Sequence, residues 1–169
     1  MEAIEAIMTR RSIRKYSSQP VSDEVQNVIL RAGMAAPSAG DQRPWHFVVI
    51  RDKSILDKIP EFHKHATMLK EAQVGILVCA DTSCEKYPGR WPLDSAACTQ
   101  NILLAAHSMG LGAVWVGIYP VEERMKGVSK LLGIPDGVKP VSIVSLGYPA
   151  EKKEPDDRFD PSRIHSDKW

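Results

Sequence analysis

Two stretches near the start of the chain repeat apolar residues at helical spacing. The first predicts a short amphipathic helix over residues 3–11. In the second, Ser22 is a suitable N-cap and Gly33 a suitable stop for another helix. The apolar positions that define the two faces are Ile4, Ile7 and Met8 in the first, and Val25, Val28, Ile29 and Ala32 in the second.

Four short, mainly apolar runs predict strands, and the first two, 45–50 and 74–80, have the apolar character of central strands that lie between two covered faces. Helical patterns connect these runs, and we expect the order αα-β-αα-β-α-β-α-β, an α+β or α/β layered domain. The predicted strands are 45–50, 74–80, 113–116 and 140–147, and the connecting helices are 53–59, 64–72, 92–109 and 121–132.

The longest helical pattern, 92–109, ends at Gly110 and is apolar almost all round, apart from Gln100, Asn101 and His107. A helix without a polar face has to be buried nearly all round. The sequence leaves open whether the core or a second subunit covers it.

The composition changes at Pro149, where a charged, proline-containing tail of residues 149–169 begins. Few of its side chains are apolar, so it cannot build a core of its own. We therefore expect residues 1–169 to form one domain whose tail lies along something else.

The chain has 169 residues, of which 43% are hydrophobic, a length suited to one compact domain. Its 22 Lys and Arg nearly balance 21 Asp and Glu. No overall field favours a polyanion, so we expect no nucleic-acid partner. An acidic N-terminus and the lack of a long apolar run argue against a signal peptide or a membrane span and favour a cytoplasmic protein.

One local cluster stands out against this balance, "MTRRSIRKYSSQP" at residues 8–20, with Arg10, Arg11, Arg14 and Lys15. It can be a solvated helix end, a nucleic-acid arm or a grip on one phosphate. Spacing alone favours the first, because cations stabilise helix C-termini.

Signatures of other chemistry are missing. The chain has no G-x-G-x-x-G after a strand, no P-loop, no H-E-x-x-H and no G-x-S-x-G. Cys79, Cys84 and Cys98 cannot all pair, and with His63 and His65 they match no zinc spacing, so we expect free thiols and no metal.

Four blocks, in order, resemble the FMN-dependent nitroreductase family of NAD(P)H-dependent flavin oxidoreductases. The blocks are "RRSIRKY" at 10–16, "APSAGDQRPWHFVV" at 36–49, "DSAACTQNILLAAHSMGLGAVWVG" at 94–117 and "GYPAEKK" at 147–153. The resemblance implies an α+β fold: a nitroreductase-like layered domain with a central, mostly antiparallel sheet flanked by helices. It also implies an intertwined homodimer with FMN at the interface, the apolar helix between subunits and the tail around the partner.

The resemblance assigns the basic cluster to the phosphate of FMN, with Arg10, Arg11 and Ser12 as ligands and Arg14 beside them. A guanidinium donates paired hydrogen bonds that suit a phosphate. A second cation comes from the tail in this family; we predict Arg158, with Lys152, Lys153 and Arg163 as alternatives.

The loop Pro37, Ser38, Ala39 and Gly40, with Gln42, resembles the segment that reaches the flavin from the partner subunit. Asp41 stands where the family usually has Asn. It either faces the flavin or, as we expect, caps its own loop.

The backbone of Gly117 and Ile118 matches the family segment that lies against flavin N5. No side chain stands out as a catalytic acid. The pocket is predicted to be open and bordered by Phe62, His63, Tyr87 and Trp91.

The implied activity takes hydride from NADH or NADPH and then reduces a small aromatic acceptor, such as a nitroaromatic or a quinone, in a ping-pong cycle. Two alternatives remain. The same fold and FMN can serve another redox reaction, such as reductive dehalogenation or substrate dehydrogenation, or the protein can bind flavin with little turnover.

Overall fold

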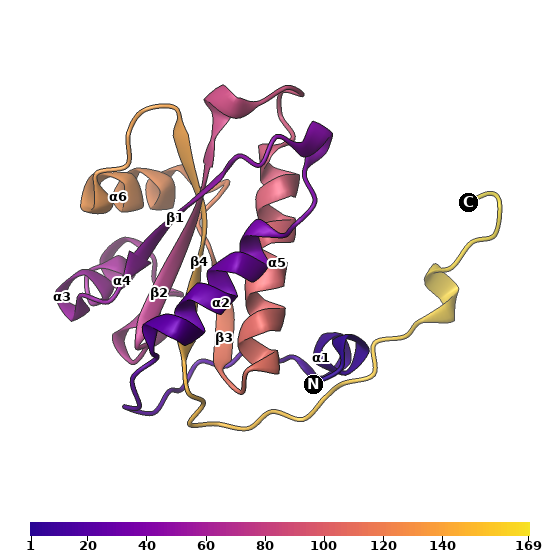
Figure 1. The fold of residues 1–169 in the computed structure, drawn as a ribbon, viewed down its shortest axis with the longest axis horizontal. Coiled ribbons are helices and arrows are strands. Elements are labelled where there is room, and N and C mark those ends of the chain that lie inside the picture. The colour runs from indigo at the N-terminus through magenta and orange to yellow at the C-terminus, as the bar shows by residue number, and fades with distance from the viewer.

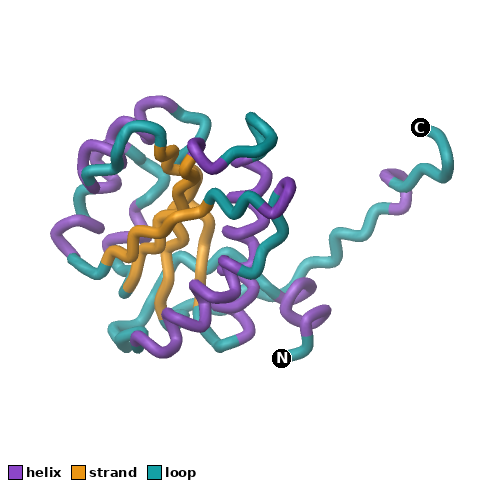
Figure 2. The backbone as a smooth tube through the Cα atoms, turned by 45° about the horizontal axis from the view of Figure 1, so that its top comes forward, coloured by secondary structure: helices purple, strands orange, loops and turns teal.

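A four-stranded sheet lies between two layers of helices in the computed structural model, which describes residues 1–169 (Figures 1 and 2). The strand order is β1-β2-β4-β3, and every pair of neighbours is antiparallel. The predicted mostly antiparallel sheet flanked by helices is confirmed. The strands are β1 (Trp45–Ile50), β2 (Val74–Asp81), β3 (Gly112–Gly117) and β4 (Val138–Gly147).

Each face of the sheet carries its own apolar core. Helices α2 (Asp23–Met34) and α5 (Trp91–Ser108) pack on one face; α3 (Lys53–Leu56), α4 (Ile59–Phe62) and α6 (Glu122–Leu132) lie on the other. Neighbouring residues of a strand point to opposite faces, so in β4 Ile143 belongs to the second core and Val144 to the first. Because both faces are covered, apolar residues follow one another along the strands, and even Ser142 and Ser145 of β4 are buried.

Gly33 does not end the second helix, contrary to the prediction. Helix α2 runs through it to Met34, and Gly33 is buried where α2 crosses α5. A Cβ here would lie 2.9 Å from Cγ1 of Ile102. The glycine allows two helices to approach closely, a use that the sequence does not distinguish from a helix stop.

Three further helix boundaries differ from those predicted. Helix α1 (Ala3–Thr9) ends before the arginines, the predicted helix 53–59 is split into α3 and α4, and 64–72 contains only a 3₁₀ turn, Thr67–Lys70. Asp52 caps α3 by accepting a hydrogen bond from the Ser54 N–H. Single turns of helix bury few residues, so their periodicity is a weak signal.

The outer sides of α1 and α5 remain uncovered in the single chain. In α5, Ile102 is fully buried in the core whereas Leu93 is 64% exposed. The apolar face predicted for the first helix is turned outward as well, since Ile4 is 72% exposed and only Ala6 of α1 is buried. None of the helices is both long and apolar enough to span a bilayer.

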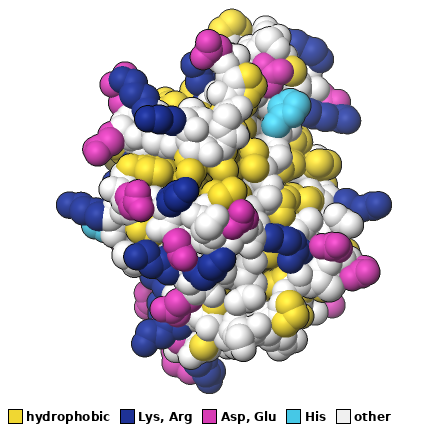
Figure 3. Space-filling model, turned by 90° about the vertical axis from the view of Figure 1, so that its left-hand side faces the viewer, with side chains coloured by type: hydrophobic (Ala, Val, Ile, Leu, Met, Phe, Trp, Pro, Cys, Tyr) yellow, Lys and Arg dark blue, Asp and Glu magenta, His cyan; other side chains and the backbone are white.

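The side of the molecule that carries α3, α4 and α6 has a mixed surface. Positive and negative side chains alternate around a band of hydrophobic atoms (Figure 3). This face therefore offers no extended positive stripe of the kind that nucleic-acid binding uses.

After α1 the chain runs along the free edge of β3. Ser12 forms a parallel bridge with Ala113, and the Ile13 N–H donates to the Ala113 carbonyl at 3.0 Å. Gly112 makes this approach possible, because a Cβ there would lie 2.6 Å from Cγ2 of Ile13 and 2.8 Å from its Cβ. The basic cluster is thereby fixed beside β3.

We expect Gly112→Ala to destabilise the protein by about 1–3 kcal/mol, the usual cost of overpacking. Ile13 is stiff at its branched Cβ, so its whole segment has to move away from β3. Urea unfolding with an unchanged m-value measures the loss. Gly117→Ala is the matched control in the same strand, because a Cβ at Gly117 would have no atom within 4 Å; an equal loss in both variants would contradict the steric explanation.

The tail leaves the body of the molecule beyond Pro149. In both ribbon views it extends away from the sheet and helices (Figures 1 and 2). Its apolar side chains contact little of this chain: Phe159 is 73% exposed and Trp169 fully exposed. The single chain thus leaves the apolar groups of the tail uncovered.

Candidate functional site

The structure brings Arg10 and Arg158 together although they are far apart in sequence. Arg10 caps the C-terminus of α1, and both side chains line a pocket of about 290 Å³ that also includes Asp156 and Phe159. The half-buried guanidinium of Arg10 has no hydrogen-bond partner in the chain. Burial, and then the charges of Arg158 and Arg11, lower the pKa of Arg10. An anion placed here would relieve this repulsion.

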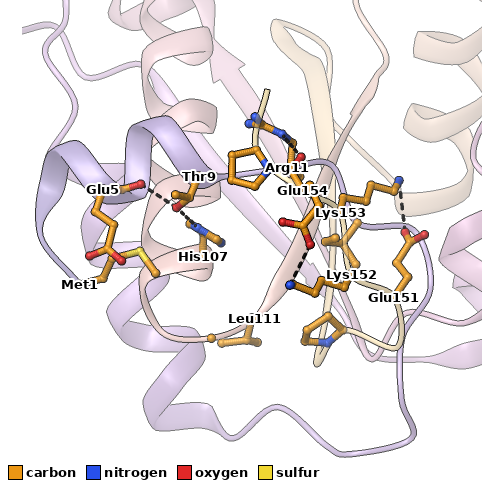
Figure 4. A pocket seen from close by; sticks show the side chains of 14 residues that line it. Met1, Glu5, Thr9, Arg11, His107, Leu111, Glu151, Lys152, Lys153 and Glu154 are labelled. Atoms are coloured by element: carbon orange, nitrogen blue, oxygen red, sulfur yellow. Dashed lines mark hydrogen bonds and ion pairs between the residues drawn. The ribbon is translucent and has the colours of Figure 1, made fainter. Parts of the chain in front are cut away.

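Arg11 is placed differently from Arg10. Its guanidinium donates to the backbone carbonyl of Glu154 at 3.0 Å (Figure 4). It also donates to the carbonyl of Asp156 at 3.2 Å and to two carbonyls at the end of α1. Arg11 therefore ties the tail to α1, and this holds Arg158 near Arg10.

The alternative tail cations form ion pairs within the tail, as Arg158 does with Asp156 at 3.6 Å. Lys152 pairs with Glu154 at 2.8 Å and Lys153 with Glu151 at 3.4 Å (Figure 4). Arg163 pairs with Asp160 at 3.0 Å. These pairs of Lys152 and Lys153 border a cavity of about 410 Å³ between the tail, α1 and the end of α5, where the charges largely neutralise one another.

Ser12 forms the bridge to β3, and Arg14 follows it two positions later. The Ser12 carbonyl accepts from Nζ of Lys153 at 2.8 Å, while no bond is formed by its hydroxyl. Arg14 is exposed, and its backbone N–H donates to the Glu151 carboxylate. Its side chain lines a second cavity, at the other end of the β3 edge.

That second cavity, of about 520 Å³, is strongly basic. None of its 11 lining residues is acidic. Its floor is the end of β3, and its charged and imidazole side chains come from the N-terminal segment, the α4 end and α6. They are Arg14, His63, Lys64, His65 and Arg124.

Gly117 closes β3 at this cavity. Its carbonyl accepts from Nε2 of His63 at 2.9 Å and from Arg124 at 3.1 Å rather than from β4. A residue of an antiparallel pair points its N–H and C=O to the same side, so the N–H of Gly117 also points off the free edge. The Ile118 N–H donates to the Val141 carbonyl. Of the two residues predicted to lie against the flavin, Gly117 is therefore the one with an available backbone N–H.

The loop that contains Pro37, Ser38, Ala39 and Gly40 is fastened to α5 by the buried carboxylate of Asp94. This carboxylate accepts from the Ala39 N–H at 3.0 Å and from Nε2 of Gln42 at 2.7 Å. The Gln42 carbonyl in turn accepts two backbone N–H groups from residues 86 and 87. Gln42 is thus a buried clamp inside the loop.

Asp41 does not cap its own loop, contrary to our expectation. Residues 40, 41 and 43 have left-handed backbone, and the Asp41 carboxylate takes two hydrogen bonds of 2.6 Å from the Arg43 guanidinium. These bonds lower the pKa of Asp41. The Ser38 hydroxyl makes the local backbone bond instead, accepting from the Arg43 N–H at 3.0 Å.

The loop and the arginines lie at opposite ends of α5. Asp94 holds the loop at the N-terminal end, and at the other end His107 contacts Thr9 of α1 at 2.8 Å. The rise of about 1.5 Å per residue separates Asp94 from His107 by about 20 Å along the axis. One chain therefore does not bring the two predicted groups to one end of the fold.

The cysteines and histidines do not converge. Cys79 and Cys98 are buried and Cys84 is exposed, all as free thiols. Burial raises the pKa of Cys79 and of Cys98 to about 12. No three His, Cys, Asp or Glu side chains gather closely enough to hold a metal ion.

Comparisons with known proteins decide the family. The model of the nitroreductase family matches residues 7–90 and 62–148. This chain belongs to the nitroreductase family. A candidate NADH dehydrogenase/NAD(P)H nitroreductase of Methanothermobacter thermautotrophicus is 54% identical over 169 residues, which cover 100% of this nitroreductase and 88% of the relative.

Solved structures share the nitroreductase fold. A candidate NADH dehydrogenase/NAD(P)H nitroreductase of Parabacteroides distasonis superimposes with a TM-score of 0.95 at 43% identity, covering 99% of this chain and 98% of that one. A nitroreductase candidate of Desulfovibrio desulfuricans, solved in complex with FMN, gives 0.86 at 31% identity, covering 100% and 98%.

Three residues of this nitroreductase gain importance only from the structure. Asp94 and Arg124 carried no signal in the sequence, because their partners lie on distant segments. His63 was expected only to border the pocket, whereas it is buried and bonded to Gly117. A histidine between apolar turns of helix was the available hint.

Proposed function

We propose that this chain is an NAD(P)H-dependent FMN oxidoreductase that acts as a homodimer with two FMN sites at the subunit interface. The observation that carries the proposal is the half-buried, unpartnered guanidinium of Arg10 beside Arg158. Arg158 pairs with Asp156 at 3.6 Å, whereas Arg10 has no acidic partner, so the two neighbouring guanidinium groups keep an excess of positive charge that suits a phosphate monoester.

The residues at the β3 edge fit the rest of FMN. Arg10 and Ser12 lie where the N-terminal segment bridges to Ala113, and Gly117 lies four residues further along β3. This stretch of about 13 Å suits a phosphate at one end and a flat ring at the other. Gly117 has no neighbour within 4 Å on its side-chain face, and it offers a backbone N–H to the ring.

A second subunit explains the features that a single chain leaves open. Because about 20 Å of α5 separates the loop from Arg10, Pro37, Ser38, Ala39 and Gly40 serve the site of the other subunit. The uncovered apolar sides of α1 and α5 form the interface, and the tail with Phe159 wraps the partner. A two-fold axis then produces two equal sites.

In this arrangement Arg10, Ser12 and Arg158 bind the phosphate, while Arg11 and Gln42 act indirectly by holding the tail and the loop. FMN, when bound, supplies the group that accepts hydride from NADH or NADPH and passes the electrons on. Arg14 and the other cations of the 520 Å³ cavity favour negative charge there.

No acidic side chain lines that cavity, and His63 is occupied by Gly117. Solvent therefore provides the protons. Donor and acceptor use one open pocket in turn, so the kinetics are ping-pong, with a nitroaromatic or a quinone as the acceptor class. Cytoplasmic location stays a prediction, as does the description of residues 1–169 as one domain.

The visible spectrum of the purified protein tests this function, with FMN added if the protein is colourless. We expect flavin bands that bleach under anaerobic NADH or NADPH and return when a quinone or a nitroaromatic is added. Bands that bleach without return by either acceptor would favour dehalogenation or dehydrogenation. Bands that do not bleach would indicate a flavin-binding protein, and a folded protein that binds no FMN would overturn the proposal.

A further inference from the structure

His63 is the most buried ionisable side chain at the edge of β3. It follows α4 directly and is 3% exposed. Its Nε2 lies 2.9 Å from the Gly117 carbonyl, while its Nδ1 is buried without any partner. A buried imidazole that forms one hydrogen bond and leaves its other nitrogen without a partner has one preferred tautomer. The hydrogen-bond partner determines which tautomer this is.

The Gly117 carbonyl determines the tautomer of His63. A carbonyl only accepts, so Nε2 of His63 carries the proton, and Nδ1 is the bare nitrogen of a neutral ring. Burial lowers the pKa of His63 most, and the nearby charges of Arg124 and His65 lower it further, whereas the bond to Gly117 opposes them. Lys64 and Arg14 add positive charge around the same cavity.

The Gly117 carbonyl is held from two sides. His63 donates from the end of α4 and Arg124 from the first turn of α6, at 2.9 and 3.1 Å. The next N–H, of Ile118, donates to Val141 on β4. Both polar groups of the Gly117–Ile118 peptide are therefore fixed. Glycine is the residue with the most backbone freedom, so this fixation decides how the end of β3 lies.

His63 itself is held rigidly. Its N–H donates to the Ile59 carbonyl at 3.1 Å, and its carbonyl accepts from the Ala66 N–H at 2.8 Å. The ring of the preceding residue, Phe62, lies on α6 at Gly127, where a Cβ would approach Phe62 Cδ2 to 2.6 Å. A glycine on α6 thus admits Phe62, and this brings α4, α6 and β3 together at His63.

We propose that His63 is a positioning residue: with Arg124 it holds the Gly117 carbonyl, and thereby directs the Gly117 N–H off the sheet edge toward the ring of the bound cofactor. This inference rests on the proposed function, which places FMN at this edge. An N–H that donates to the electron-accepting ring favours added electron density. His63 therefore raises the reduction potential of the flavin without contacting the reacting atoms.

Two substitutions separate positioning from packing. His63→Phe keeps a planar ring but removes the donor, whereas His63→Gln keeps an amide donor that can reach Gly117. His46→Phe is the matched control, because His46 is an exposed histidine on β1. The measurements are the ¹⁵N amide signal of Gly117 with and without FMN, and the midpoint potential of bound FMN.

In the wild type we expect FMN to shift the Gly117 signal. His63→Phe alters this signal already without FMN, lowers the midpoint potential and raises the FMN dissociation constant about fivefold, as for one hydrogen bond. His63→Gln restores the wild-type signal and potential, and His46→Phe changes neither.

The measurements distinguish a wrong placement of FMN from a wrong role of His63. A wild-type Gly117 signal that ignores FMN means that the cofactor does not lie at this edge, and the proposed placement of FMN fails together with the inference. A signal that responds in the wild type and is the same in His63→Phe, with an equal potential, overturns the positioning role alone. If His63→Phe does not fold, the imidazole ¹⁵N signals of the wild type decide: a proton on Nδ1 instead of Nε2 overturns the inference.

Discussion

Arg10→Ala raises the dissociation constant for FMN about 10- to 150-fold, which corresponds to the loss of about 1.5–3 kcal/mol for a hydrogen bond to a charged group. The Arg10 side chain is half-buried, has no partner in the chain and lies next to Arg158; burial, and after it the charge of Arg158, lowers the pKa of Arg10. A phosphate is the group that completes this arrangement.

Titration of the apoprotein with FMN, followed by flavin fluorescence, measures the loss. Riboflavin is the matched ligand control: it lacks the phosphate, so its affinity should be nearly the same in wild type and variant. Arg31→Ala, which removes an exposed guanidinium from α2, should leave FMN binding unchanged. An equal loss for riboflavin and FMN would assign Arg10 a structural role, and no loss at all would place the phosphate elsewhere.

Most of the fold follows from the sequence because the strands are buried on both faces. The runs around Val78 and Ile143 have no polar face, and both strands lie in the middle of the sheet. Local signals fail where a residue serves a distant contact. Gly33 has the appearance of a helix stop, but its neighbour Ile102 on α5 determines its use.

The candidate site shows the same difference between residues that a local pattern identifies and residues whose role depends on a distant contact. The motif identified the basic cluster, but the different placements of Arg10 and Arg11 depend on carbonyls of the tail, 143 and 145 positions away from Arg11. Likewise, Gln42 is polar in a polar loop, and only Asp94 on α5 makes it a buried clamp. Pairings of this kind come from the tertiary structure, which local pattern does not encode.

Asp94→Ala is expected to detach the loop from α5. It removes the acceptor of the Ala39 N–H and of Nε2 of Gln42, both at the buried carboxylate, at a cost of about 1.5–3 kcal/mol for hydrogen bonds to a charged group. We also expect FMN binding to fall, because in the proposed dimer the loop contributes to the site of the partner. Urea unfolding gives the stability, and the flavin content after gel filtration gives the binding.

A mixed dimer tests whether the site is shared between subunits. In a dimer of one Arg10→Ala subunit and one Asp94→Ala subunit, the site that uses the intact loop of the first and the intact Arg10 of the second is complete, and the other site lacks both. We therefore expect one tightly bound FMN per mixed dimer, although each parent homodimer binds FMN weakly.

Two affinity tags, one on each subunit, isolate the mixed species. If loop and arginine served one site from the same chain, both sites of the mixed dimer would be damaged, and no tight FMN would return. The stoichiometry of tightly bound flavin thus separates a shared site from two independent ones.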